Sequence, residues 1–182
     1  MKNFSTLLLV VACLFLAGNL KAGNNTKHAE KKEKAIMPSD NDRMNGDWYK
    51  YVEDAQKESK KTGKPILANF TGSDWCGWCI RLKKEVFNTD EFKKWAKENV
   101  ILLELDFPRR TPLPEDLKAQ NSSLQQAFRV SGYPTIWIFD LNFNKDTKQY
   151  NIEAIGKTGY VAGGPEKWIQ GAEQILSQRK SK

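Results

Sequence analysis

Two cysteines three residues apart, Cys76 and Cys79, are the side chains of this sequence best suited to covalent chemistry. They lie in the segment GSDWCGWCIRLKKEVF, residues 72–87, in which a tryptophan precedes each cysteine. A close pair of thiols can bind a metal ion, form a structural disulfide or exchange electrons with another disulfide. The rest of the chain helps to distinguish between these three uses.

A metal site and a structural disulfide both fit the pair poorly. Structural zinc takes four ligands and catalytic zinc usually three protein ligands, whereas the chain adds only one remote histidine, His28, to the two cysteines. A disulfide that closes so short a loop removes little chain entropy from the unfolded state, so it stabilises the fold only slightly. Electron exchange is the better interpretation, and neither a metal nor another bound cofactor is expected.

The N-terminus is typical of an exported protein. Residues 1–22 contain an early lysine, an apolar run from about Leu7 to Ala17, and a small residue, Ala22, at the end. This is the layout of a secretory signal peptide. An alternative is lipoprotein processing at Cys13. We expect cleavage after Ala22 and a periplasmic location, with membrane contact only if a lipid is attached to Cys13.

Removal of the signal peptide would leave Cys76 and Cys79 as the only thiols. An exported protein can form disulfides, but this one has no wider disulfide framework. Residues 23–45 are polar and charged and are predicted to be a flexible linker. One domain is therefore expected over residues 46–182.

The charge pattern argues against nucleic-acid binding. The formal net charge is +7, but lysines are interleaved with acidic residues along the chain. A nucleic-acid interface would require basic and aromatic side chains gathered on one face. No dimerisation module is recognisable, so we expect a monomer.

Short apolar segments alternate with helical patterns along the domain. Strands are predicted at residues 66–70, 100–106, 135–140 and around 148–155. Helices are predicted at 47–62, 76–87, 90–99, 124–130 and from 165 onward. Between them, residues 107–120 contain three prolines and are expected to form a long loop. This order predicts an α/β fold with a mixed central sheet of about four strands, flanked by helices and preceded by an extra N-terminal helix capped by Asp47.

The predicted position of Cys76 favours it as the attacking thiol. Cys76 falls where a strand and a turn meet the start of a helix, and there unpaired N–H groups and the helix dipole stabilise a thiolate. The thiolate is the form that attacks a disulfide. Cys79, one helical turn later, can then resolve the mixed disulfide in an intramolecular step.

Two segments resemble the thioredoxin family. ILANFTGSDWCGWC, residues 66–79, resembles the strand and active-site segment of thioredoxins and their exported relatives. Residues 132–135, GYPT, resemble the loop that in this family carries a cis-proline facing the cysteines, here Pro134. The resemblance covers roughly residues 47–178, including the order of elements, and implies a thioredoxin fold.

The resemblance also implies a thiol–disulfide oxidoreductase whose Cys76–Cys79 disulfide is redox-active. Its partners would be protein thiols or disulfides and a redox partner. Trp75, Trp78, Tyr133 and Pro134 match positions that frame the substrate surface in this family, and Trp78, at a helix start, is expected to be partly exposed.

One departure concerns the proton chemistry of Cys79. Thioredoxins usually carry a buried aspartate in the strand before the motif, which helps to deprotonate the resolving cysteine; the nearest residue here is Asn69, which cannot act as a base. Asp74 and Glu85 are alternatives, but a turn residue and a surface charge are the favoured interpretations of these two.

The direction of electron flow follows only weakly from the sequence. The Gly-Trp pair between the cysteines is closer to the Gly-Pro of thioredoxins than to the dipeptides of strong oxidases, which favours a reductase. Two alternatives stay open: a protein that holds a client thiol or copper without turnover, and a maturation factor for one partner such as an apocytochrome.

Overall fold

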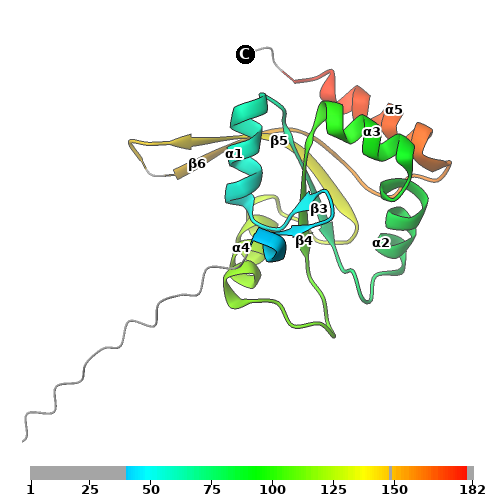
Figure 1. The fold of residues 1–182 in the computed structure, drawn as a ribbon, viewed down its shortest axis with the longest axis horizontal. Coiled ribbons are helices and arrows are strands. Elements are labelled where there is room, and N and C mark those ends of the chain that lie inside the picture. The colour runs from blue at the N-terminus through cyan, green and yellow to red at the C-terminus, as the bar shows by residue number, and fades with distance from the viewer. Residues whose placement is uncertain (1–39, 148, 180–182) are drawn as a thin grey trace, which may run out of the picture. The chain divides into compact units, whose positions relative to one another are not determined.

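A mixed sheet with helices on both faces organises the chain (Figure 1). The computed structural model describes residues 40–147 and 149–179. The predicted signal peptide, residue Cys13 and most of the predicted linker lie outside these residues. The predicted α/β class with a mixed central sheet is confirmed.

The most apolar segments form the centre of the six-stranded sheet, whose order is β1-β2-β4-β3-β5-β6. Strand β3 (Ile66–Thr71) is buried along its whole length, as expected of a strand covered on both faces. It pairs in parallel with β4 (Ile101–Asp106) and antiparallel with β5 (Thr135–Asn144). Strand β6 (Gln149–Thr158) forms a hairpin with β5 that extends beyond the rest of the sheet (Figure 1).

Helices divide between the two faces of the sheet. On one face, α1 (Val52–Thr62) and α4 (Glu115–Ala127) cover a core that includes Phe70. The other face carries four helical segments around Trp168. They are α2 (Gly77–Leu82), the π-helical turn η2 (Lys83–Phe87), α3 (Asp90–Asn99) and α5 (Gly164–Leu176). The β3–α2 connection therefore places the cysteines at the carboxyl end of the central strand.

The N-terminal boundary differs from the prediction. Residues 40–45, expected in the linker, form a 3-10 turn, η1 (Asp40–Arg43), and the short strand β1 (Met44–Asn45). Strand β2 (Trp48–Tyr49) replaces the predicted first turn of helix, so Asp47 is not its cap and α1 begins only at Val52. Gly46, with φ of 60°, allows the tight turn between the two strands.

Packing explains why β2 is extended rather than helical. Tyr49 pairs with Leu103 of β4, and the Trp48 ring lies 5.1 Å from that of Phe87. These contacts add two short strands to the four predicted ones.

The predicted loop at 107–120 is shorter than expected because α4 already begins at Glu115. Pro114 precedes the helix, and Glu115 and Asp116 lie in its first turn, where negative charge is favourable. Only Leu117 and Asn121 of α4 are buried, so its apolar periodicity is weak. The connecting loop is thus residues 107–114.

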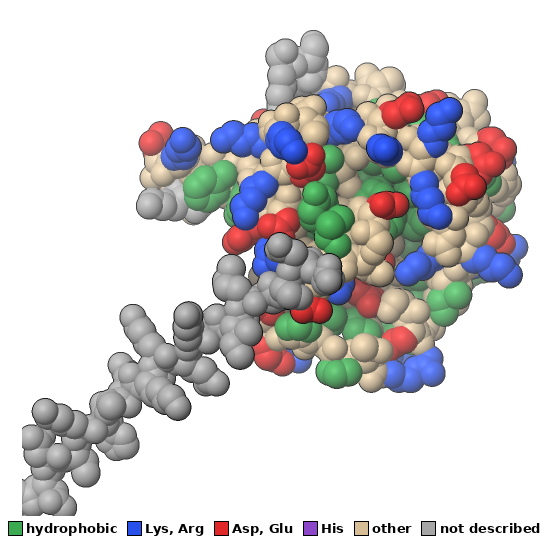
Figure 2. Space-filling view, in the orientation of Figure 1, with side chains coloured by type: hydrophobic (Ala, Val, Ile, Leu, Met, Phe, Trp, Pro, Cys, Tyr) green, Lys and Arg blue, Asp and Glu red, His purple; other side chains and the backbone are tan. Residues whose placement is uncertain are grey.

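On the face shown in Figure 2, the Lys and Arg side chains of the described residues are interspersed with Asp and Glu. Apolar side chains reach the surface between them. The charge pattern of this face is therefore mixed.

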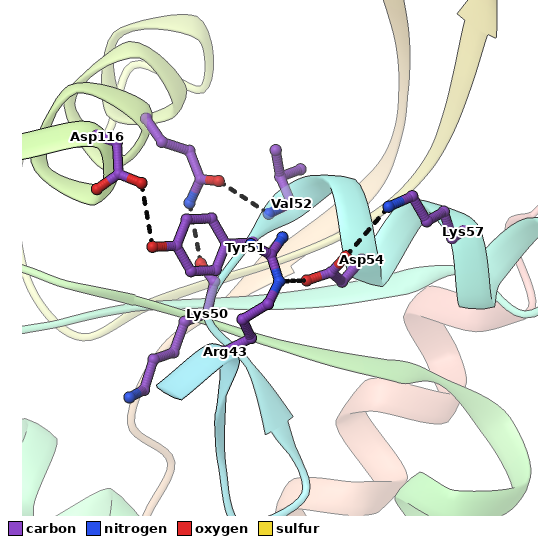
Figure 3. Close-up of polar contacts among 8 residues, drawn as sticks. Arg43, Lys50, Tyr51, Val52, Asp54, Lys57 and Asp116 are labelled. Atoms are coloured by element: carbon purple, nitrogen blue, oxygen red, sulfur yellow. Dashed lines mark hydrogen bonds and ion pairs between the residues drawn. The ribbon is translucent and has the colours of Figure 1, made fainter. Parts of the chain in front are cut away.

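A polar network ties the N-terminal segment to α1 and α4 (Figure 3). Arg43 donates to Asp54 at 2.5 Å and lies over the ring of Tyr51, whose hydroxyl donates to Asp116 at 3.1 Å. The Gln120 side chain accepts a hydrogen bond from the Val52 N–H and donates one to the backbone carbonyl of Lys50. The network fixes where α1 begins.

The Arg43–Asp54 ion pair is expected to stabilise the fold. Partial burial is the largest single effect and acts to raise the pKa of Asp54, but the hydrogen bonds and positive charges of Arg43 and Lys57 together lower it by more, so the pKa lies below its ordinary value. Asp54→Asn should lower the free energy of unfolding by about 1–2 kcal/mol in urea titrations at pH 7. Because the folded-state pKa is depressed, the wild-type advantage should persist above about pH 4 and vanish as the pH falls below it.

The matched control is Glu115→Gln, which removes a weaker exposed pair with Lys118 at 3.9 Å and should change stability little. Equal losses in the two variants would contradict a specific role for Asp54.

Candidate active site

Cys76 and Cys79 form a disulfide at the start of α2, with their Cα atoms 5.2 Å apart. Cys76 is the N-cap residue, and the backbone N–H of Cys79 donates to its Sγ at 3.2 Å. At most helix starts, the side-chain oxygen of the N-cap residue accepts a hydrogen bond from a backbone N–H of the first turn. Here the acceptor is the sulfur of Cys76 instead. This contact would favour a thiolate at Cys76 in the reduced protein.

Exposure alone does not distinguish the two sulfurs. Cys76 is 6% exposed and Cys79 is 5% exposed, so both cysteines are nearly buried in the disulfide form. The exposed side chains are their neighbours, Trp78 at 56% and Ile80 at 51%. The difference between the cysteines must therefore come from their surroundings.

Trp75 is fixed beside Cys76 by contacts from three segments. Its Nε1–H donates to the carbonyl of Phe107 at 2.8 Å, and the Arg109 guanidinium lies 3.7 Å from its ring centre. The ring of Tyr133 meets it edge-on at 5.7 Å. Gly72 is required beneath it, because a Cβ there would lie 2.5 Å from the indole.

The Tyr133–Pro134 peptide bond is cis. Thr135 pairs with Phe70, which places the start of β5 beside the end of β3. The Tyr133 hydroxyl accepts a hydrogen bond from Gln125 at 2.6 Å, and burial raises the pKa of Tyr133. The predicted proline loop thus lies at the same end of the sheet as the disulfide.

Trp78 belongs to a second, more exposed cluster. Its ring lies 5.0 Å from that of Tyr160, and the Arg81 guanidinium lies over both. Glu85 accepts from Arg81 at 2.6 Å and from the Tyr160 hydroxyl at 2.7 Å, and these two hydrogen bonds, Arg81 first, lower the pKa of Glu85. Glu85 therefore orients this surface, and no contact with Cys79 is seen.

Asp74 secures the loop that follows β4. Its carboxylate accepts the backbone N–H groups of Arg109, Arg110 and Thr111 at 2.9, 2.8 and 3.0 Å. These bonds, with that from Arg109 the largest, lower the pKa of Asp74. The Asp74 side chain therefore stabilises a turn through hydrogen bonds to backbone amides, which agrees with the interpretation of Asp74 as a turn residue.

Two polar residues of the sheet, Asn69 and Glu104, share a pocket with Cys79. Asn69 is 6% exposed, and its Oδ1 has no hydrogen-bond partner among the described residues. Asn69 and Glu104 line, together with Cys79, a pocket of about 240 Å³. Glu104 was not among the residues singled out in the sequence.

Comparison with known proteins adds a family to this geometry. Residues 52–145 match the family described as "Thioredoxin-like domain". The chain belongs to this thioredoxin-like family. The predicted thioredoxin fold is thereby confirmed, and a solved structure titled "DsbH Oxidoreductase" superimposes with a TM-score of 0.63 at 27% identity, covering 81% of this chain and 95% of that one.

Two relatives from Chlamydia pneumoniae are also similar to this thioredoxin-like chain. "Disulfide bond reductase DsbH" is 35% identical over 115 residues, which cover 63% of this chain and 68% of DsbH. "Thioredoxin-related protein DsbJ" is 28% identical over 117 residues, but the match spans only 33% of DsbJ. These likenesses support thiol–disulfide oxidoreductase activity at the level of the family.

Among residues 40–147 and 149–179, the helices of this thioredoxin-like protein are too short or too polar to cross a membrane.

Besides Glu104, three residues that contact the predicted site residues were not predicted from the sequence: Phe107, Arg109 and Tyr160. The first two follow the carboxyl end of β4, which is parallel to β3 and ends at the same edge of the sheet as the strand that leads to Cys76. That topology is the signal that could have indicated them.

Asp74→Ala should release the loop at residues 107–114. The amides of Arg109, Arg110 and Thr111 would lose their acceptor, so their hydrogen exchange should accelerate about tenfold or more, measured by NMR. In the wild type, the shifts of these amides should titrate with a midpoint below the usual aspartate pKa of about 3.9, because the folded-state pKa is lowered.

Asp146→Ala, at the exposed β5–β6 turn, serves as control and should leave these amides unchanged. Unaltered exchange in Asp74→Ala would contradict the role given to Asp74.

Proposed function

We propose that this protein is an exported, periplasmic thiol–disulfide oxidoreductase that acts mainly as a reductase of protein disulfides. The observation that carries the proposal is the Cys76–Cys79 disulfide at a helix start, with the Cys79 N–H directed at Cys76 Sγ. Residues 1–22 support export. The name of the relative "Disulfide bond reductase DsbH" and the Gly-Trp dipeptide support the reductive direction.

The proposed reaction begins with both cysteines reduced. The Cys76 thiolate attacks one sulfur of a substrate disulfide, forms a mixed disulfide and releases the other substrate sulfur as a thiolate. Cys79 then loses its proton and attacks Cys76 Sγ, which releases the second substrate thiolate. The protein ends as the disulfide seen in the structure, and the substrate gains two electrons and two protons.

The cycle requires a second dithiol to reduce Cys76–Cys79 again, so a redox partner of that chemistry is part of the proposal. A bound cofactor is not needed for these steps. We assign the protein as a monomer in this cycle.

The surface around Cys76 is suited to an extended polypeptide. Trp75 and Tyr133 form a fixed aromatic wall, while Trp78 offers exposed apolar area beside the disulfide. The backbone next to Pro134 would pair with the substrate as an added strand. We propose these four residues as the substrate contacts.

Cys76→Ser should abolish reduction of a disulfide-bonded peptide by the purified protein, because the attacking thiolate is lost. Cys79→Ser should keep the first step and accumulate a mixed disulfide, detected by mass spectrometry. Cross-links within that trapped complex are expected between the substrate and the surface formed by Trp78 and Tyr133.

Turnover by Cys76→Ser would contradict the assignment of the attacking cysteine. A wild-type protein that bound thiols or copper but reduced nothing would instead favour the non-turnover function.

The direction of electron flow is tested by the reduction potential of the pair. A reductase should equilibrate with glutathione near the thioredoxin value of about −270 mV, whereas a strong oxidase lies near about −120 mV. A potential close to the latter value would overturn the reductive direction while leaving the exchange chemistry intact.

A further inference from the structure

A pocket lined by both polar and apolar side chains lies beside Cys79, on the face of the sheet that α2 covers. Its volume is about 240 Å³, large enough for several water molecules. Asn69 and Thr71 of β3 and Glu104 of β4 line it together with Cys79, and Lys83 and Lys84 of η2 also contribute. Among these lining residues, Glu104 is the only carboxylate.

Strand register brings the acid to this place. Leu67 and Leu102 are paired and belong to the apolar core on this face. Two residues further along each strand, Asn69 pairs with Glu104 on the same face. The face thus changes from apolar to polar as it approaches the cysteines.

Polar groups at a buried sheet surface cost folding free energy unless they form hydrogen bonds. Asn69 is 6% exposed, and its Oδ1 has no partner among the described residues. Such an orphaned acceptor beside a pocket of this size is suited to bind water.

We propose that Glu104 is the proton acceptor for Cys79, and that it acts through water held in this pocket with the help of Asn69. The proposal rests on the proposed function, in which Cys79 is the resolving thiol. The base for Cys79 would then be Glu104 on β4, because Asn69 on β3 cannot accept a proton.

The other acids near the active site are engaged elsewhere. Asp74 accepts three backbone amides, and Glu85 is held by Arg81 and Tyr160. Asp106, two residues beyond Glu104 on the same face, accepts from the Ser73 N–H and hydroxyl at 2.9 and 2.6 Å.

Glu104 itself is partly exposed, and its Oε1 accepts from the Asn45 side chain at 2.8 Å. The charged groups that share its pocket are Lys83 and Lys84. The contact with Asn45 also gives β1 a function, since it orients the side chain.

The proton-transfer step balances as follows. In the mixed disulfide, the Cys79 thiol gives its proton to a pocket water, which passes a proton to the Glu104 carboxylate. The Cys79 sulfur forms a bond with Cys76 Sγ while the bond between Cys76 and the substrate sulfur breaks. The departing substrate thiolate takes up a proton, and Glu104 returns its own to solvent.

Glu104→Gln tests the inference. Formation of the mixed disulfide at Cys76 should keep its wild-type rate, whereas resolution by Cys79 at pH 7 should slow at least about tenfold, measured by rapid quenching and mass spectrometry. The difference should shrink as the pH approaches about 8.5, where a cysteine thiol ionises without a base. A purely structural loss would not recover in this way.

Two further variants sharpen the test. Glu104→Asp keeps a carboxylate and should retain most of the resolution rate, while Glu98→Gln on the exposed surface of α3 should have no effect. The inference is overturned if Glu104→Gln resolves at the wild-type rate, if its loss is the same at every pH, or if the Asp and Gln variants lose equally.

Failure of the proposed exchange chemistry would look different, since the wild-type protein would then form no mixed disulfide at Cys76.

Discussion

Burial of β3 on both faces is the constraint on which the site depends. Every residue of Ile66–Thr71 is buried, so a shift in register would move its apolar side chains out of both cores. The end of this strand, and Cys76 beyond it, are therefore fixed relative to β4 and β5. Since β4 ends and β5 begins at the same edge, the loop at 107–114 and the Tyr133–Pro134 segment must meet the disulfide.

Turn chemistry then converts this convergence into a defined surface. Asp74 binds the backbone of the 107–114 loop, and the same loop supplies the carbonyl that holds Trp75 and the guanidinium that covers it. Because Gly72 has no side chain, the indole can pack directly on the turn. Polar groups of this loop are thus used for positioning, and for that reason they are poor candidates for proton transfer.

Much of the fold was predictable because its core elements have clear periodicity. Strands β1 and β2 were missed because each is only two residues long, which is too short to show an alternation of polar and apolar residues. Most of α4 was missed because only Leu117 and Asn121 are buried, so the helix has little apolar periodicity. The cysteine pair was evident from its local spacing. Glu104 was not, because its proximity to Asn69 arises from pairing between two strands, and a single sequence does not show that register.

The two cysteines are almost equally buried, so their proposed division of labour must arise from what surrounds each. Cys76 receives the N–H of the first helical turn and lies next to Trp75, which favours charge on sulfur and contact with a substrate. Cys79 instead lines the pocket that contains Asn69 and Glu104, where a proton can leave toward water. With the acid on β4, the proposed proton path to the Cys79 sulfur runs through the pocket that Glu104 and Cys79 both line, where water can bridge them. Residues at the substrate surface therefore act on the attacking sulfur, and residues of the sheet act on the resolving sulfur. The rates of the two steps consequently depend on different residues.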